Sequence, residues 1–198
     1  FAKISARNIE KELTASRLRE AACDNIFDII NNCKLSIVLQ PIYDFKAKSI
    51  KGFECLSRFQ VEPYRSPDYW FNQANISGVG EALELFAIEE SLSLLPLIPE
   101  QYYITLNVSP KHLTSLYLQS VLDKAPLHRI VLEVTERESI PDYKAFRNAI
   151  QHFRDRGMRL AVDDAGAGFA SFQHIVELEA DIIKLDRSLI ANLNSDQR

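Results

Sequence analysis

The chain has 198 residues, of which 46% are hydrophobic and only six are glycine, so it is long enough to bury one sizeable core. Its 23 basic and 27 acidic residues give a formal charge of −4 without a run of Lys or Arg, which argues against a DNA or RNA polymer as partner. The three cysteines form no CxxC pair, so neither a disulfide scaffold nor a zinc knuckle is expected. No apolar run approaches the roughly 18 residues of a membrane span. We therefore expect a cytoplasmic segment without membrane contact, although the full-length protein could be anchored upstream.

Residues 1–33 are predicted to form a helical lead-in. Apolar side chains recur there every three to five residues, without any Gly or Pro, as an amphipathic helix requires. This helix is either a linker cut from a longer protein or an ordinary helix packed on the domain that follows. The domain itself is expected to span residues 34–198.

From Lys34 onward, short β-rich runs alternate with helical ones. The six predicted strands are SIVLQPI, SIKGFECLS, YYITLNV, RIVLEV, RLAVDDA and DIIKLD. Helical patterns cover residues 79–95, 111–122, 142–156 and 171–178. This alternation favours a parallel α/β fold, either a doubly wound sheet or a barrel.

Polar side chains gather near the carboxyl ends of successive strands. Five strands contribute at least one each, which favours a barrel, because its strand ends all converge on one face. The polar residues are Glu54, Asn107, Glu133, Asp163, Asp164 and Lys184. A complete (βα)8 barrel usually needs about 250 residues, so the chain is expected to lack its last two βα units.

The stretch GFECLSRF places two charges in a buried-looking strand. Glu54 and Arg58 share a strand face, but about 3.3 Å per residue separates them by roughly 13 Å, too far for a salt bridge. Each therefore needs a partner of its own. Arg58 reaching solvent and Glu54 pairing with another strand would satisfy both charges without any functional site.

Carboxylates brought together at these strand ends would repel one another unless they protonate or find a cation. A hard divalent cation is the natural compensation, and an all-oxygen ligand set selects Mg²⁺, Mn²⁺ or Ca²⁺ over Zn²⁺. Lys184 could orient a water or a phosphate oxygen, or serve only as a counter-ion.

The stretch DDAGAGFAS predicts a turn at the end of its strand. Adjacent aspartates on a strand point to opposite faces, so Asp163 and Asp164 can serve one site only where the chain turns, and Gly166 and Gly168 would supply that turn. A plain loop with aspartate caps explains one aspartate but not readily both.

These motifs resemble those of the EAL domain family, whose bacterial members hydrolyse cyclic di-GMP. The resemblance runs in family order from Leu35 to the end of the chain. It rests on QPI, GFECLSRF with ECL in place of EAL, NVSP, LEVTE, DDAGAGFAS and DIIKLD.

The resemblance implies a TIM-like (βα)8 barrel with one antiparallel strand, about six of its strands being present here. It also implies two Mg²⁺ or Mn²⁺ ions at the strand ends and a role for each matching residue. The implied metal ligands are Glu54, Asn107, Glu133, Asp163 and Asp164. The implied catalytic residues are Lys184, Asp164 and Glu54, Lys184 contacting the attacking water. Gln40, Leu56 and Arg58 would hold the dinucleotide, and Glu136 would stabilise the loop after the aspartate pair.

The implied function is hydrolysis of cyclic di-GMP to linear pGpG in second-messenger signalling. A homodimer and an upstream sensor or GGDEF domain are the implied partners. Cys55 replaces the motif alanine on the face opposite Glu54, which should leave that ligand in place. Ala165 and Ala167 replace the commoner Phe and Thr, which bears on loop dynamics and dimer coupling.

The seventh and eighth strands of the family carry a further glutamate and a glutamine, so this chain alone is expected to be inactive. The alternative is a catalytically silent EAL domain that acts as a receptor or an interaction module. The residues alone would also support a Mg²⁺-dependent barrel acting on another phosphate ester.

Overall fold

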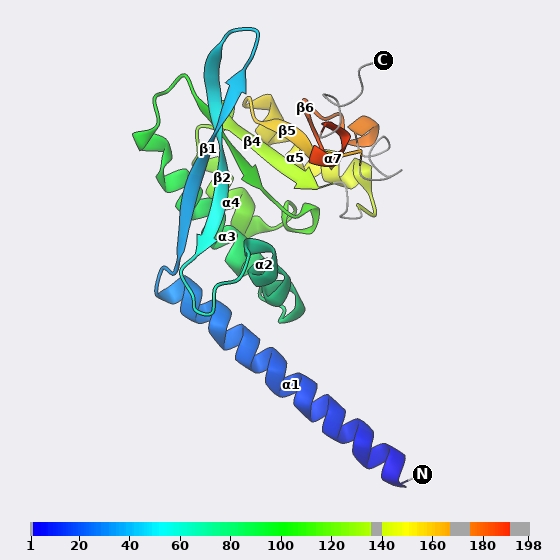
Figure 1. Cartoon of the computed structure of the whole chain (residues 1–198). Coiled ribbons are helices and arrows are strands. Elements are labelled where there is room, and N and C mark those ends of the chain that lie inside the picture. Colours follow the sequence, from blue (N-terminus) through cyan, green and yellow to red (C-terminus); the bar gives the residue numbers. More distant parts are fainter. Residues whose placement is uncertain (1, 136–139, 167–174, 191–198) are drawn as a thin grey trace, which may run out of the picture. The chain divides into compact units, whose positions relative to one another are not determined.

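The computed structural model describes residues 2–135, 140–166 and 175–190, and Figure 1 shows how helices and strands alternate along them. The α-helices are α1 (Ala2–Asn31), α2 (Pro67–Ile76), α3 (Gly80–Ser93), α4 (Leu116–Asp123), α5 (Tyr143–Asp155) and α7 (Arg187–Ile190), and residues 175–178 form a further helical turn. The strands are β1 (Leu35–Asp44), β2 (Ser49–Phe59), β3 (Tyr103–Asn107), β4 (Ile130–Thr135), β5 (Arg159–Ala165) and β6 (Ile182–Leu185). Three short 3₁₀ helices are η1 (Leu95–Leu97), η2 (Pro110–His112) and η3 (Leu127–Arg129).

The chain divides into two compact units. The first comprises Phe1–Val38 and Leu56–Glu90, and the second comprises Leu39–Cys55 and Ser91–Arg198. The predicted boundary at residue 34 between a lead-in and a domain remains a prediction.

The first unit has its own apolar core. Ile26 and Ile29 at the end of α1 pack with Trp70 and Ala74 of α2, together with Leu35, Phe59, Leu83 and Ala87. Nearer its start, α1 leaves Ile9, Leu13 and Leu18 exposed. Among the described residues, no helix is both long and apolar enough to cross a membrane.

The six strands form one sheet in the order β1-β2-β3-β4-β5-β6. The pairs from β2–β3 to β5–β6 are parallel. The β1 and β2 strands are joined by residues 45–48 alone, a connection that only antiparallel strands allow. This sequential order, parallel except for one strand, confirms the predicted α/β class and agrees with part of a TIM-like barrel.

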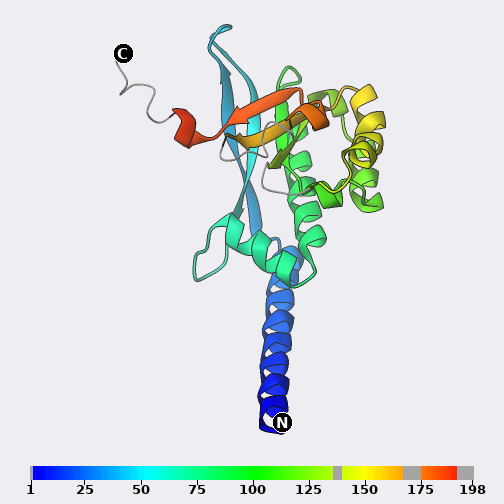
Figure 2. The same ribbon diagram turned by 90° about the vertical axis from the view of Figure 1, so that its right-hand side faces the viewer.

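The central strands have one apolar and one polar face. Their outward positions, such as Ile104, Leu132 and Leu160, are fully buried, and Figure 2 shows α5 along one side of these strands. The apolar residues of α5 recur at the helical spacing of one buried stripe, namely Phe146, Ile150 and Phe153. The opposite face of the sheet carries the polar residues of the strand ends.

Candidate metal centre

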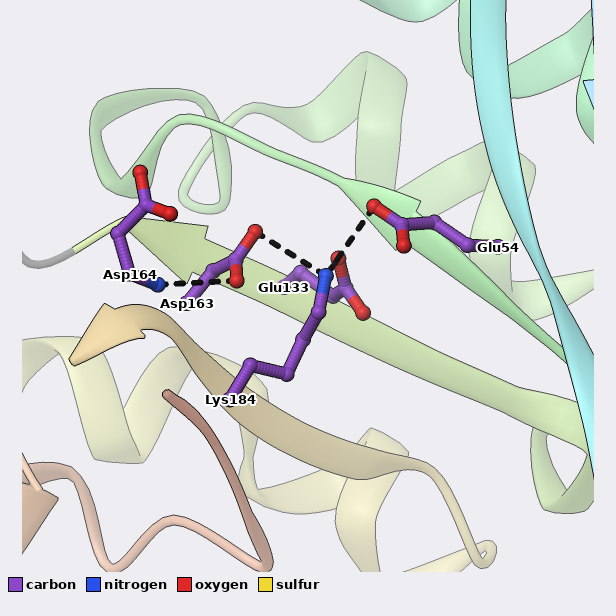
Figure 3. A network of polar contacts seen from close by, with 5 residues as sticks. All are labelled: Glu54, Glu133, Asp163, Asp164 and Lys184. Atoms are coloured by element: carbon purple, nitrogen blue, oxygen red, sulfur yellow. Dashed lines mark hydrogen bonds and ion pairs between the residues drawn. The ribbon is translucent and has the colours of Figure 1, made fainter. Parts of the chain in front are cut away.

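The Lys184 ammonium lies among three carboxylates from three other strands (Figure 3). Its Nζ donates to Glu133 Oε2 at 2.6 Å, to Glu54 Oε1 at 3.1 Å and to Asp163 Oδ2 at 3.1 Å. One oxygen from each of these carboxylates lies within 4.8 Å of the other two. Four of the predicted site residues therefore converge on one point.

Curvature of the sheet brings Lys184 and Glu54 together. Their strands, β6 and β2, are separated by three others in the sheet order, which on a flat sheet would place them about 19 Å apart. A Lys and a Glu side chain cannot span that distance, yet their charged atoms are 3.1 Å apart. The sheet of the second unit is therefore strongly curled, with the polar cluster on its concave face.

Strand register explains why the polar residues share this face. Glu133 is the Cα partner of Asn107 on β3, and Thr105, two residues earlier on β3, is the partner of Glu54. Because partners in a parallel sheet project from the same face and side chains alternate along each strand, all four side chains point into the concave face. Asn107 thus stands beside Glu133, although it is exposed to solvent.

Sequence reasoning missed Thr105. It is 2% exposed, and within the described part of the chain its Oγ1 has no hydrogen-bond partner. Thr105 lies two residues before Asn107, a spacing that predicts the same face of the strand. In a strand that is otherwise apolar, however, the sequence gives no reason to single out one hydroxyl.

The electrostatics of the cluster follow from burial and from opposite charge. Burial raises the pKa of Glu133, which is 1% exposed, and the charges of Glu54 and Asp163 raise it further, whereas Lys184 opposes the shift. Burial alone would lower the pKa of Lys184, but the three carboxylates, Glu133 foremost, raise it above its ordinary value. The lysine is therefore held as a cation.

The chain turns at the second aspartate of the pair and at Gly166, as predicted, whereas Gly168 lies outside the described residues. Asp164 has a φ of +56° and Gly166 a φ of +106°, both left-handed, and the register of β5 with β6 shifts between Val162 and Ala165. The Asp164 N–H donates to Asp163 Oδ1 at 2.9 Å. In Figure 3 the Asp164 carboxylate lies beside that of Asp163, on the far side from Glu54.

The remaining predicted site residues lie as follows. Gln40 is exposed on β1 in the second unit, whereas Leu56 and Arg58 are half-buried on the part of β2 that belongs to the first unit. Arg58 Nη1 donates to the Ser57 carbonyl oxygen at 2.8 Å. Glu136 lies outside the described residues. The proposed roles of these residues in ligand binding remain predictions.

Cys55, which stands between Glu54 and Leu56, faces away from the cluster. The residue is 6% exposed, and burial raises the pKa of its thiol to about 11, so the thiol is neutral at physiological pH. The substitution thus adds no charge beside Glu54.

The donor set fits a hard divalent cation. The three converging groups are carboxylates on separate strands, and the Asn107 amide and the Asp164 carboxylate lie next to them in register or in sequence. Oxygen ligands of this kind suit Mg²⁺, Mn²⁺ or Ca²⁺. The Lys184 ammonium already provides one positive charge at their centre.

Comparisons with known proteins bear on the family and the fold of the chain. The profile described as "EAL domain" matches residues 15–198. A relative in Escherichia coli K12, named "Probable cyclic di-GMP phosphodiesterase PdeB", is 31% identical over 175 residues, which are 82% of this chain and 34% of the relative. The chain thus spans about a third of the length of this curated relative.

Solved structures support the same fold. The Klebsiella pneumoniae BlrP1 protein in a manganese and cyclic di-GMP complex superposes with a TM-score of 0.68 at 25% identity, over 81% of this chain and 42% of that one. An EAL domain protein from Listeria monocytogenes EGD-e superposes with a TM-score of 0.75 at 23% identity, over 87% of this chain and 71% of that one.

Proposed function

The chain belongs to the EAL domain family, and from this premise we propose that it is part of a cyclic di-GMP phosphodiesterase. The reaction would be the hydrolysis of one phosphodiester bond of the cyclic dinucleotide by water, with linear pGpG as product. The name of the Escherichia coli relative and the ligands of the Klebsiella pneumoniae structure support this proposal.

The observation that carries the proposal is the convergence of Glu54, Glu133 and Asp163 within 4.8 Å on the concave face of the sheet. Mg²⁺ or Mn²⁺ bound there would acidify a water molecule and offset the charge of the phosphate oxygens. In this proposal the three carboxylates hold the ions, with Asn107 and Asp164 as further ligands.

Lys184 has two roles in the proposed site. Its ammonium restrains the three carboxylate side chains in one arrangement, because it donates to all of them. It also places a fixed positive charge where an attacking water and a phosphate oxygen would meet. Gln40, Leu56 and Arg58 are proposed to hold the dinucleotide.

A silent receptor is the second candidate, and the Lys184 ammonium favours it. Since an internal cation already neutralises part of the cluster, these carboxylates can be buried without a metal ion. Such a domain would bind cyclic di-GMP, or a protein partner, without turnover.

One assay separates these functions. The full-length domain is incubated with cyclic di-GMP and Mg²⁺ or Mn²⁺, binding is measured by calorimetry, and pGpG is measured by chromatography. Formation of pGpG that EDTA and the substitution Glu133→Gln both abolish supports the enzyme. Tight binding without turnover supports the receptor, and the absence of both binding and turnover refutes both.

Homodimerisation, an upstream sensor or GGDEF domain, and a cytoplasmic location accompany this proposal as predictions. Size-exclusion chromatography with light scattering tests the first of them directly.

A further inference from the structure

The tip of the β1–β2 hairpin, residues 43–51, presents aromatic side chains to solvent. Phe45 is 87% exposed, and no other large apolar side chain among the described residues is as exposed. Tyr43 contacts it edge-on, with ring centroids 5.5 Å apart, and is 48% exposed; Ile50 is 37% exposed. Figures 1 and 2 both show this tip standing clear of the other strands of its unit.

Basic residues lie close to Phe45 in the hairpin tip. Lys46, Lys48 and Lys51 all lie within the tip and are exposed, and Asp44 is its one acidic residue. Asp44 Oδ1 accepts the N–H groups of Lys46 and Ala47 at 2.8 and 2.9 Å, and its Oδ2 lies 3.8 Å from the Lys51 ammonium. The aspartate therefore fixes the turn, and the tip keeps a net charge of +2, from three lysines and one aspartate.

We propose that the hairpin tip docks on an anionic lipid surface, with Phe45 inserted at the headgroup level and the lysines against the lipid charges. Tyrosine favours the membrane interface, phenylalanine buries its ring at the boundary of the headgroups, and clustered lysines are attracted to anionic lipids. A protein partner would fit less well, because lysine is depleted at protein interfaces and the strongest contacts there fill pockets, whereas this tip is convex.

This inference departs from the sequence expectation of no membrane contact, which concerned long apolar runs. A hairpin tip contributes a single inserted ring and a few charges, so no such run is needed. One weak anchor of this kind gives reversible binding, in the way that a single lipid chain does.

Docking through the tip would also set the direction in which the acidic cluster faces. The tip lies at the start of β2, and Glu54 lies five residues beyond Ser49, about 17 Å along the strand. Phosphate headgroups would repel Glu54, Glu133 and Asp163, so the tip holds the carboxylates away from the lipid surface.

Vesicle binding by the whole chain tests the proposal. Sedimentation with phosphatidylcholine vesicles is compared with sedimentation at 30% phosphatidylglycerol, at low and high salt. Binding is expected only to the anionic vesicles and is expected to weaken with salt. The substitution Phe45→Trp adds a second tryptophan to the buried Trp70, and its emission should shift to the blue on binding.

Two tip variants and two matched controls locate the contact. Replacing Lys46 and Lys48 with Gln should lower the partition coefficient about 30-fold, at about fivefold per lysine. Phe45→Ser should lower it about tenfold or more through lost burial. The controls, Tyr117→Ser and the double variant Lys11→Gln with Lys124→Gln, should bind as the wild type does, because these exposed residues lie elsewhere.

Equal losses in the tip and control variants, with all of them folded by circular dichroism, would overturn the proposal. So would equal binding to neutral and anionic vesicles, or none to either. Self-association that Phe45→Ser abolishes, without vesicle binding, would instead identify a second copy of the chain as the occupant and would also overturn it.

Discussion

Replacing Lys184 with Met tests whether the ammonium and a divalent cation neutralise the same carboxylates. The substitution keeps most of the side-chain volume but removes the charge that contacts Glu133 at 2.6 Å. At an effective dielectric constant of about 20, that one contact is worth roughly 6 kcal/mol of gross attraction. Because the variant no longer bears the cost of removing the ammonium from water, the net loss is smaller, about 3 kcal/mol, the lower end for breaking a buried pair.

The assay is thermal unfolding in EDTA and with increasing Mg²⁺ or Mn²⁺. A loss of about 3 kcal/mol should lower the melting temperature by roughly 6 to 12 °C for a chain of this size. A cation at 100 times its dissociation constant should restore about 2.7 kcal/mol. The cation should stabilise the variant more than it stabilises the wild type, since the ammonium of the wild type already neutralises part of the charge that attracts the cation.

The matched control is Lys34→Met. Lys34 also contacts a carboxylate, that of Asp28, at 2.6 Å, but both side chains of that pair are exposed. This variant should melt close to the wild type and should gain nothing extra from metal. If Lys184→Met melts with the wild type in EDTA, or if metal stabilises both equally, the ammonium does not compensate the cluster and the reasoning fails.

Three further substitutions test the structure around the site, each by urea unfolding. Gly52→Ala should cost about 1 to 3 kcal/mol, because its Cβ would lie 2.5 Å from the carbonyl oxygen of Tyr103 and 2.7 Å from its ring. Arg129→Met should cost about 3 kcal/mol or more, because the buried guanidinium donates to the carbonyl oxygens of Tyr102, Ile98, Pro99 and Leu95. Thr105→Val should leave stability unchanged or raise it by up to about 1 kcal/mol, because the hydroxyl that it removes is buried without a partner.

For each of these three substitutions, one result of urea unfolding would contradict the prediction. A Gly52→Ala protein as stable as the wild type would mean that Tyr103 moves freely on β3. A neutral Arg129→Met would mean that the carbonyl oxygens find water instead. A Thr105→Val protein destabilised by more than about 1 kcal/mol would mean that the hydroxyl has a partner.

The strands could be predicted from the sequence, because buried parallel strands are nearly continuous apolar runs. The run from Arg159, for example, is β5 in full. The helix α2 was missed, since a segment that begins at Pro67 and is rich in aromatic residues looks like a loop; proline is in fact well suited to a first helical turn. The helix predicted from Lys111 begins only at Leu116, after the 3₁₀ turn η2.

The convergence of Glu54, Glu133 and Asp163 could also be predicted, because parallel strands end on one face. The central position of Lys184 could not. Its contact with Glu54 depends on how far the sheet curls between β2 and β6, and curvature arises from packing over the whole sheet, not from the residues at the strand ends. The sequence therefore left the lysine open as a counter-ion or a catalytic group, and its three contacts support the first role and are compatible with the second.

The charge of the cluster bears on what a phosphodiester requires there. Glu54, Glu133, Asp163 and the proposed further ligand Asp164 contribute −4 and Lys184 contributes +1, which leaves −3 with all five groups ionised. One divalent cation would leave the total at −1, and only a second would make it positive. A cyclic dinucleotide, whose two phosphates are both anionic, is attracted to the site only when two cations are bound, which favours the two-ion expectation.

The same argument applies to an enzyme and to a receptor that places a phosphate at this cluster, so EDTA should weaken cyclic di-GMP binding for either. Metal dependence of binding therefore cannot separate the two functions, and the formation of pGpG can.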